Sequence, residues 1–164
     1  MEVYNLDNLK FAFDLLDNCK DIREDSEYHP EKCVLSHSMQ VLELAFKESD
    51  DIDLILSAML HDIGKAIYTI DHDNIGIELL KDYVSVKTLW LIEHHMRIWY
   101  FLEGKMKKLS KVQYLSQHPW LSDLILLARW DKSGRNPNIT VEYNKERIIE
   151  RLNLCVNKHF KNNT

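Results

Sequence analysis

The chain has 164 residues, of which 45% are hydrophobic and 29% are charged, as expected for a single globular domain. No segment approaches the roughly 20 apolar residues that a membrane span needs, and the first residues lack the pattern of a signal peptide. The net charge of −5 is uneven, because residues 1–62 carry 15 acidic and 5 basic side chains and residues 63–164 carry 11 and 16. The basic remainder could steer an anionic substrate, but it lacks the strong excess of a dedicated nucleic-acid-binding protein.

The three cysteines, Cys19, Cys33 and Cys155, are widely separated and show no Cys-x-x-Cys spacing. Their odd number and spacing argue against a disulfide framework and against a zinc clip. They are typical of reduced thiols, and we expect a cytoplasmic protein that is not bound to a membrane.

Hydrophobic residues recur with helical spacing along nearly the whole chain, and glycine and proline number only 4 and 3. We predict one compact all-α domain over residues 1–164, with about six to eight helices. In chain order, helices are expected over about residues 7–18, 30–47, 51–60, 74–80, 86–92, 120–130 and 144–159. Asp73 or Asn74 is the expected N-cap of the fourth helix and Ser85 that of the fifth. Residues 20–30 and 132–137 are predicted loops, and residues 104–119 are the least regular part.

The most informative segment is Leu-His-Asp-Ile-Gly-Lys at residues 60–65. An imidazole and a carboxylate, here His61 and Asp62, are good ligands for a divalent transition metal. Adjacent side chains on a helix diverge, so both can reach one ion only where the helix ends. Gly64 is well placed to end it.

Two further polar residues are predicted to point inward. His37 follows Val34 by three residues and precedes Val41 by four, which places it on a buried stripe. Asp131 follows Leu127 by four residues, and an inward carboxylate without a basic partner is costly unless a cation accompanies it. A lone inward histidine is more often a hydrogen-bonded core residue, but together with His61-Asp62 these residues indicate a metal site.

His37, His61-Asp62 and Asp131, in this order, resemble the H…HD…D signature of the HD superfamily of metal-dependent phosphohydrolases. The resemblance covers about residues 31–136, and Ala58-Met-Leu-His-Asp-Ile-Gly-Lys65 is its most distinctive stretch. It implies that His37, His61, Asp62 and Asp131 ligate one ion of Mn, Fe, Co, Ni or Zn. It also implies that the ion activates a water for attack on a phosphate ester, with Asp62 among the catalytic residues.

A closer likeness is to the HD domain attached to some bacterial tRNA nucleotidyltransferases. It rests on His72-Asp-Asn-Ile-Gly76, on Leu91-Ile-Glu-His-His95 and on residues 123–135. Trp130 replaces the usual small residue before the aspartate and could narrow the pocket or fill the core. The nucleotidyltransferase domain is absent, so CCA addition is not implied, although an RNA end is a possible partner.

In dinuclear branches of the superfamily, further histidines hold a second ion and the aspartate bridges the two. His72, His94 and His95 are the candidates here, although His72 follows Asp62 by only 10 residues and a branch-specific Gly-Tyr-Pro segment is missing. In the mononuclear alternative, His72 and His95 contact the phosphate or act as acid or base. Of the adjacent pair, His95 is the preferred inward residue.

Basic side chains are candidates for binding the phosphate. Lys65 directly follows the ligand pair, and we also count it among the catalytic residues. Arg135 is a second candidate, and Arg97 could reach the site if His94 does. A basic run is more often a solvated surface than a substrate groove, and it consists of Lys105, Lys107, Lys108 and Lys111.

We therefore expect a phosphomonoesterase or phosphodiesterase that acts on a nucleotide or nucleotide-derived substrate. One alternative is a nucleoside-triphosphate or dinucleotide hydrolase. Another is a non-catalytic sensor of a nucleotide or an RNA end, and a third is an oxidative member of the same fold with a di-iron centre. The retention of every ligand together with Lys65 favours the enzyme, because a sensor needs no activated water.

Overall fold

The computed structural model of the chain describes residues 3–23, 33–139, 141 and 143–163. Within these ranges the protein is all-α, with nine α-helices, one 3-10 turn and no strand beyond an isolated bridge between Arg23 and Cys33. Eight of the helices have at least seven residues, and the predicted all-α class is confirmed. No described helix has both the length and the apolar character that crossing a membrane requires.

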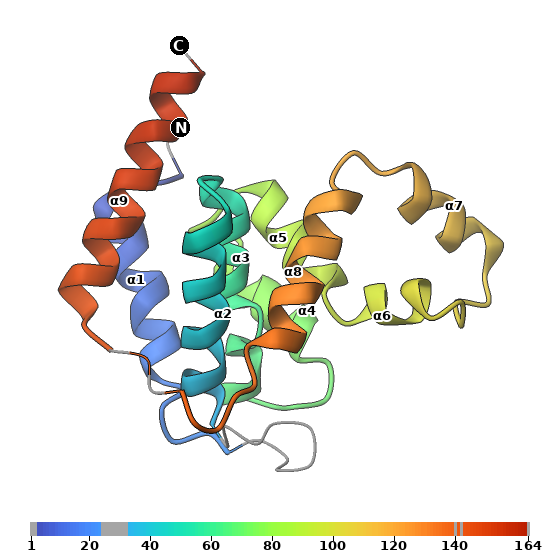
Figure 1. Cartoon of the computed structure of the whole chain (residues 1–164), viewed down its shortest axis with the longest axis horizontal. Coiled ribbons are helices and arrows are strands. Elements are labelled where there is room, and N and C mark those ends of the chain that lie inside the picture. Colours follow the sequence, from blue (N-terminus) through green and yellow to red (C-terminus); the bar gives the residue numbers. More distant parts are fainter. Residues whose placement is uncertain (1–2, 24–32, 140, 142, 164) are drawn as a thin grey trace.

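The helices pack side by side, with a smaller arm extending to one side (Figure 1). Their bounds, in chain order, are α1 Leu6–Asp17, α2 Val34–Glu48, α3 Ile52–Leu60, the 3-10 turn η1 Ile63–Ala66, α4 His72–Leu80, α5 Val86–His94, α6 Arg97–Leu102, α7 Leu109–Gln117, α8 Leu121–Ser133 and α9 Lys145–Asn162.

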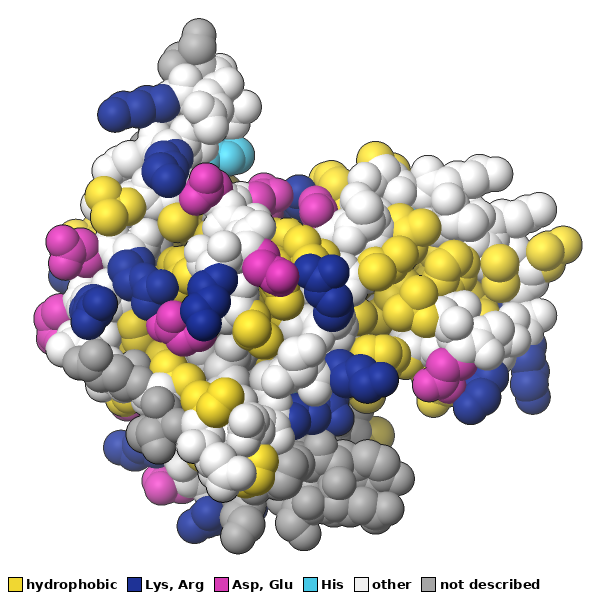
Figure 2. All heavy atoms as spheres, viewed as in Figure 1, with side chains coloured by type: hydrophobic (Ala, Val, Ile, Leu, Met, Phe, Trp, Pro, Cys, Tyr) yellow, Lys and Arg dark blue, Asp and Glu magenta, His cyan; other side chains and the backbone are white. Residues whose placement is uncertain are grey.

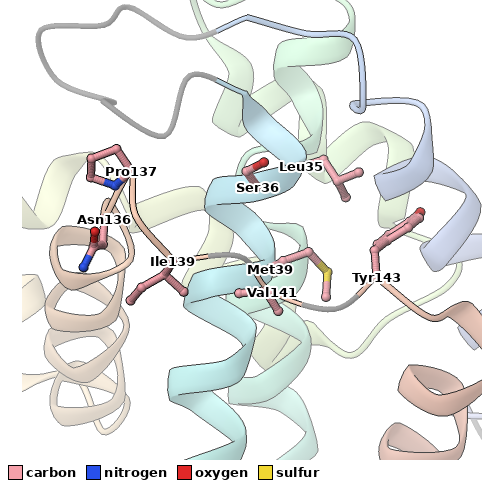
Figure 3. A pocket seen from close by; sticks show the side chains of 8 residues that line it. All are labelled: Leu35, Ser36, Met39, Asn136, Pro137, Ile139, Val141 and Tyr143. Carbon is pink, nitrogen blue, oxygen red and sulfur yellow. The ribbon is translucent and has the colours of Figure 1, made fainter.

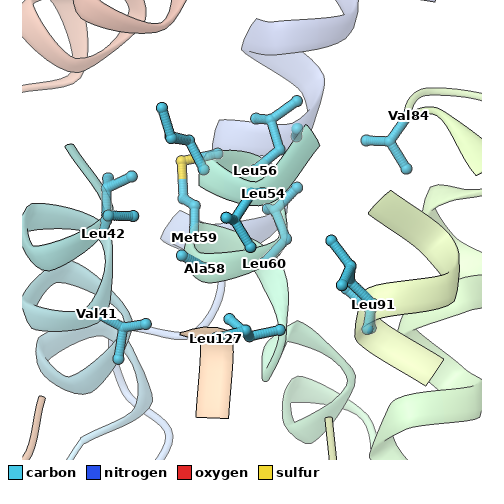
Figure 4. Packing of buried hydrophobic residues seen from close by; sticks show 14 of the residues in the cluster. Val41, Leu42, Leu54, Leu56, Ala58, Met59, Leu60, Val84, Leu91 and Leu127 are labelled. Atoms are coloured by element: carbon cyan, nitrogen blue, oxygen red, sulfur yellow. The ribbon is translucent and has the colours of Figure 1, made fainter. Parts of the chain in front are cut away.

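Helix α3 is the centre of the hydrophobic core. Every residue of α3 except Asp53 is buried, and the helix packs against α1, α2, α5, α8 and α9. A helix that is apolar on all sides is stable only inside a protein, because each fully buried Leu or Ile contributes about 1.5–3 kcal/mol. Figure 4 shows its side chains between those of the neighbouring helices, among them Leu42, Leu91 and Leu127. Because α3 runs through the core, His61, which directly follows its last residue, is also buried.

The helix boundaries follow local capping chemistry. Ser85 caps α5 by accepting a hydrogen bond from the Thr88 amide at 3.1 Å, as predicted. The predicted N-cap of α4 is wrong, because α4 begins at His72 and Asp71 precedes it in a left-handed conformation with φ 64°. An aspartate tolerates this conformation better than most residues do.

Two other boundaries differ from the prediction. Helix α2 begins at Val34, with the Cys33 sulfur as its cap acceptor, and the predicted start at residues 30–32 lies outside the described residues. Helix α8 continues to Ser133 instead of ending near Trp130, so Asp131 lies in its last turn. Trp130 is buried and donates a hydrogen bond to Glu48, so it fills the core instead of lining a pocket.

The arm consists of α6 and α7, and the helix α7 lies within residues 104–119, which the sequence predicts to be the least regular part. The only buried residue of α7 is Leu115, and α7 packs against α8. Figure 2 shows hydrophobic side chains gathered over this part of the molecule. Its exposed apolar residues include Tyr100, Leu102, Leu109 and Tyr114. A helix with so narrow a buried face gives a weak periodic signal, which explains why the sequence does not reveal it.

Candidate metal centre

Six buried ligand-type side chains converge where several helices end. His61 is the C-cap of α3 and His95 is the C-cap of α5, while Asp62 opens the 3-10 turn. The other three come from the first turn of α2, the start of α4 and the last turn of α8, and they are His37, His72 and Asp131. All six have at most 5% of their surface exposed, so the helix ends enclose a polar centre within an apolar core.

The four histidines of this centre are oriented in the same way. In each ring Nδ1 lies within hydrogen-bonding distance of a main-chain carbonyl oxygen and therefore carries a hydrogen that it donates. The acceptors are Gly134 for His37 at 2.8 Å, Ala58 for His61 at 2.9 Å, Thr69 for His72 at 2.9 Å and Ile92 for His95 at 2.6 Å. Whenever one of these rings is neutral, it consequently presents the lone pair of Nε2 to the centre.

One group of ligand atoms is formed by His37, His61, Asp62 and Asp131. The two Nε2 atoms are 3.3 Å apart, and Oδ2 of Asp62 lies 3.2 Å from His61 Nε2 and 3.6 Å from His37 Nε2. Oδ1 of Asp131 lies 2.9 Å from His37 Nε2 and 3.5 Å from His61 Nε2. His37, His61 and Asp62 therefore bring their ligand atoms within 4.8 Å of one another, and an Asp131 oxygen lies beside both histidines.

A second group is formed by the other oxygen of Asp62 with His72 and His95. Oδ1 of Asp62 lies 3.1 Å from His72 Nε2 and 3.4 Å from His95 Nε2, and these two nitrogens are 3.1 Å apart. In both groups, Asp62 and the two histidines place their ligand atoms within 4.8 Å of one another. Asp62 therefore lies between two histidine pairs and directs one oxygen to each.

These donor atoms need a cation between them. Two Nε2 lone pairs that face each other at 3.1 or 3.3 Å repel unless a proton or a metal ion lies between them. A mixture of imidazole and carboxylate donors is typical of sites for Mn, Fe, Co, Ni or Zn. The residues present therefore fit one ion in each group.

The charges of the centre favour a positive occupant. Burial opposes ionisation of His61, but the Asp62 charge and the hydrogen bonds to Asp131 and Asp62 raise its pKa to about 10. Burial also opposes ionisation of both carboxyls, but their histidine partners hold the pKa of Asp62 and of Asp131 well below the ordinary value. In the metal-free protein, a proton on His61 therefore takes the place of a cation.

The family model for the HD domain matches residues 34–133. The chain belongs to the HD-domain family. The matched range is more than half of the chain, and it contains all six residues of the centre. Within this HD domain, Asp62 belongs to both ligand groups, whereas His61 belongs to the first.

Two basic residues of the predicted site lie beside the carboxylates. Nζ of Lys65 is 3.3 Å from Oδ2 of Asp62, and a guanidinium nitrogen of Arg135 is 3.3 Å from Oδ1 of Asp131. Arg135 also donates from Nε to the Asp131 carbonyl at 3.1 Å. Both cations are therefore close enough to the centre to contact a phosphate there.

The structure does not bring His94 or Arg97 to the centre. Adjacent helical residues point about 100° apart, so His95 faces inward whereas His94 stacks on Trp90 with ring centroids 4.4 Å apart. Burial lowers the pKa of His94, whose Nδ1 donates to the Trp90 carbonyl at 2.9 Å. Arg97 is partly exposed and lies 3.6 Å from Glu93.

Other predicted features also lie apart from the ligands. The basic run Lys105–Lys111 belongs to the arm, where Lys105 pairs with Glu103 at 2.9 Å. A cavity of about 270 Å³, shown in Figure 3, is lined by Leu35, Met39, Tyr143 and their neighbours, and it contains none of the six residues. The carbonyl groups that orient the histidines could not be identified from sequence, because any residue type supplies them.

Gly64 is required where the 3-10 turn meets the start of α4. A Cβ at this position would overlap the His72 carbonyl oxygen and lie 2.8 Å from the His72 carbonyl carbon. We therefore expect Gly64→Ala to lower the free energy of unfolding by about 1–3 kcal/mol or more. Gly76→Ala is the matched control, because a Cβ there would meet its nearest atom at 3.6 Å and alanine favours a helix. Urea unfolding checks both, and equal stabilities of the two variants would contradict the prediction.

Metal binding is expected to release a proton. His61, with its pKa raised from 6.5 to about 10, is protonated at pH 7.5 and must lose this proton before Nε2 can bind an ion. The apparent metal affinity should therefore rise as the pH increases towards 10. Calorimetric titration with Mn²⁺ in buffers of different ionisation enthalpy should show release of about one proton. An observed heat that does not depend on the buffer would contradict this.

The same shift predicts how the stability of the metal-free protein depends on pH. The folded-state pKa of His61 is raised, so protonated His61 stabilises the folded protein. This contribution to the free energy of unfolding is complete below pH 6.5 and disappears as the pH rises through about 10. The pKa values of Asp62 and Asp131 shift in the opposite direction, downward. Their contributions to the free energy of unfolding are therefore present above pH 3.8 and are lost as the pH falls through the lowered pKa values.

Proposed function

We propose that this HD-domain protein is a metal-dependent phosphohydrolase that cleaves a phosphate ester of a nucleotide or nucleotide-derived substrate. The observation that carries the proposal is the position of Asp62, whose two carboxylate oxygens face two separate histidine pairs. This arrangement supports two ions that share Asp62. His37, His61 and Asp131 would complete the first site, and His72 and His95 would complete the second.

Bound divalent ions would supply Lewis acidity, neutralising charge on the phosphoryl group and lowering the pKa of a water molecule. The chain itself fixes where this happens. The main-chain carbonyls hold each imidazole in one orientation, and burial keeps competing water away from the ligands. Lys65 and Arg135 would contact the phosphoryl oxygens that are not bound to a metal ion.

His72 and His95 have a second possible role. If only the first site held an ion, their Nε2 atoms would face the substrate as hydrogen-bonding or acid–base groups. Asp62 would still orient both rings, since its Oδ1 is 3.1 Å from His72 and 3.4 Å from His95. We favour the dinuclear form, because the short distance between the two nitrogens calls for a cation.

The nucleotide part of the proposal rests on the likeness of residues 72–76, 91–95 and 123–135 to the HD domain of bacterial tRNA nucleotidyltransferases. A nucleoside-triphosphate or dinucleotide hydrolase, a nucleotide or RNA-end sensor and an oxidative di-iron protein are the competing functions. A cytoplasmic location is part of the proposal. Lys65 favours hydrolysis over oxidation, because it places a positive charge where a phosphate would bind.

Metal analysis of protein purified without chelator is the first test, and we expect Mn, Fe, Co, Ni or Zn. Hydrolysis of mono-, di-, tri- and cyclic nucleotides and of an aryl phosphodiester is then measured with added Mn²⁺ or Co²⁺. Metal without turnover of any of these compounds would favour the sensor. Iron together with oxygen consumption would favour the oxidative protein, and absence of metal binding would overturn the site itself.

A further inference from the structure

The segment between the 3-10 turn and α4 exposes an unusual group of apolar side chains. Ile67, Tyr68 and Ile70 have 63%, 60% and 69% of their surface exposed, so three of four consecutive residues are large, apolar and open to solvent. They are far more exposed than the buried apolar residues of the core, which have at most 9% of their surface exposed. A cluster of this kind is more informative than a single exposed hydrophobic residue.

Hydrogen bonds and close backbone packing hold the two ends of this segment near each other. The amides of Ile67 and Tyr68 both donate to the Gly64 carbonyl, at 3.0 and 3.1 Å. Gly64 itself packs against the backbone of His72, so the two ends of the segment touch. Asn74 Nδ2 donates to Oδ1 of the left-handed Asp71 at 2.5 Å, which fixes the turn into α4. The exposed side chains are therefore presented from a defined backbone.

The residues on either side of this segment lie at the metal centre. Lys65, which pairs with Asp62, lies two residues before Ile67, and His72 lies two residues after Ile70. The Thr69 carbonyl accepts the hydrogen bond from His72 Nδ1 at 2.9 Å, so the backbone between Tyr68 and Ile70 directly supports a ligand. The apolar group therefore lies, along the chain, between two residues of the place where the substrate phosphate is proposed to bind.

We propose that residues 67–70 form the surface that binds the organic part of the substrate, with the nucleobase stacked on the Tyr68 ring. This inference rests on the proposed function and names the part of the substrate that determines selectivity. Lys65, Arg135 and the metal ligands provide charge for the phosphoryl group, but they offer no apolar surface. A sugar phosphate has no flat apolar face, whereas a nucleobase has one that an aromatic ring can stack on.

The test compares the hydrolysis of the four common nucleoside 5′-monophosphates with that of ribose 5-phosphate in Mn²⁺-supplemented protein. We expect at least one nucleotide to be preferred, and Tyr68→Ala to raise its KM about tenfold while leaving ribose 5-phosphate unchanged. Tyr68→Phe keeps the ring and should retain most of the preference. Tyr100→Ala is the matched control, because Tyr100 is also 60% exposed but lies on the arm.

Binding gives a readout that does not need turnover. In chelator-treated protein, calorimetry should show that Tyr68→Ala weakens the binding of the preferred nucleotide and not that of ribose 5-phosphate. Equal cleavage of nucleotides and ribose 5-phosphate, unaltered by Tyr68→Ala, would overturn the inference and leave the proposed function intact. Unchanged nucleotide binding in Tyr68→Ala would overturn the inference whether or not the compounds are cleaved. The proposed function itself would be overturned only if the metal-bound protein also failed to cleave di-, tri- and cyclic nucleotides and an aryl phosphodiester.

Discussion

Asp62→Ala should lose both metal ions and nearly all phosphohydrolase activity. One carboxylate faces two histidine pairs, with Oδ2 at 3.2 Å from His61 and Oδ1 at 3.1 Å from His72, so its removal leaves each pair without its shared anion. We expect turnover to fall by roughly a thousandfold or more, because hydrolysis depends on the ions. Metal content by mass spectrometry and phosphate release with saturating Mn²⁺ measure the two losses separately.

Two companion variants separate a loss of metal from a loss of folding. Asp62→Asn has almost the same volume as Asp62 and should fold, but its amide cannot supply two anionic oxygens. Asp123→Ala removes a carboxylate from α8, the helix that carries Asp131, where its partner is Lys87 at 2.7 Å. Asp123→Ala should keep its metal. Full metal content in folded Asp62→Ala or Asp62→Asn would show that the centre is assigned to the wrong residues.

The sequence predicts four of the six ligand-type residues of the centre from periodicity and local chemistry, whereas His72 and His95 are candidates only through the family resemblance, together with His94, which lies elsewhere. Helical spacing places His37 and Asp131 on buried stripes, and both are buried. The expectation that a helix ends at the His61-Asp62 pair is also confirmed, since α3 stops at Leu60 and lets the two side chains converge. Gly64 does not end α3 as expected, because it lies within the 3-10 turn; it packs closely against His72 instead.

The parts that the sequence does not predict depend on tertiary contacts. The α4 cap is one example, because the choice between Asp71, Asp73 and Asn74 is made by the turn that brings His72 against Gly64. Helix α7 is another, since it gains little burial of its own and is held against α8. The same limit applies to the distinction between one ion and two, because spacing along the chain does not reveal that Asp62 divides its oxygens between two groups.

His72 and His95 provide the experiment that counts the ions. We expect wild-type protein to bind two equivalents of Mn²⁺, whereas His72→Ala and His95→Ala should each bind one, because either substitution leaves the second group with one histidine and Asp62 alone. The first group keeps all its donors in these variants, so a single ion should remain there. Turnover should fall by roughly a hundredfold to a thousandfold, since the ion that His72 and His95 would hold would no longer supply its share of Lewis acidity.

His94→Ala is the matched control for this experiment, because His94 is adjacent to His95 and is also buried. Its ring stacks on Trp90 and its Nδ1 donates to the Trp90 carbonyl, so the substitution removes a packed imidazole without removing a ligand. We expect His94→Ala to bind two ions and to lose only some stability. If wild-type protein bound one ion and His72→Ala kept it, the mononuclear alternative would hold. His72 would then act on the substrate, and its replacement should lower turnover without changing the metal content.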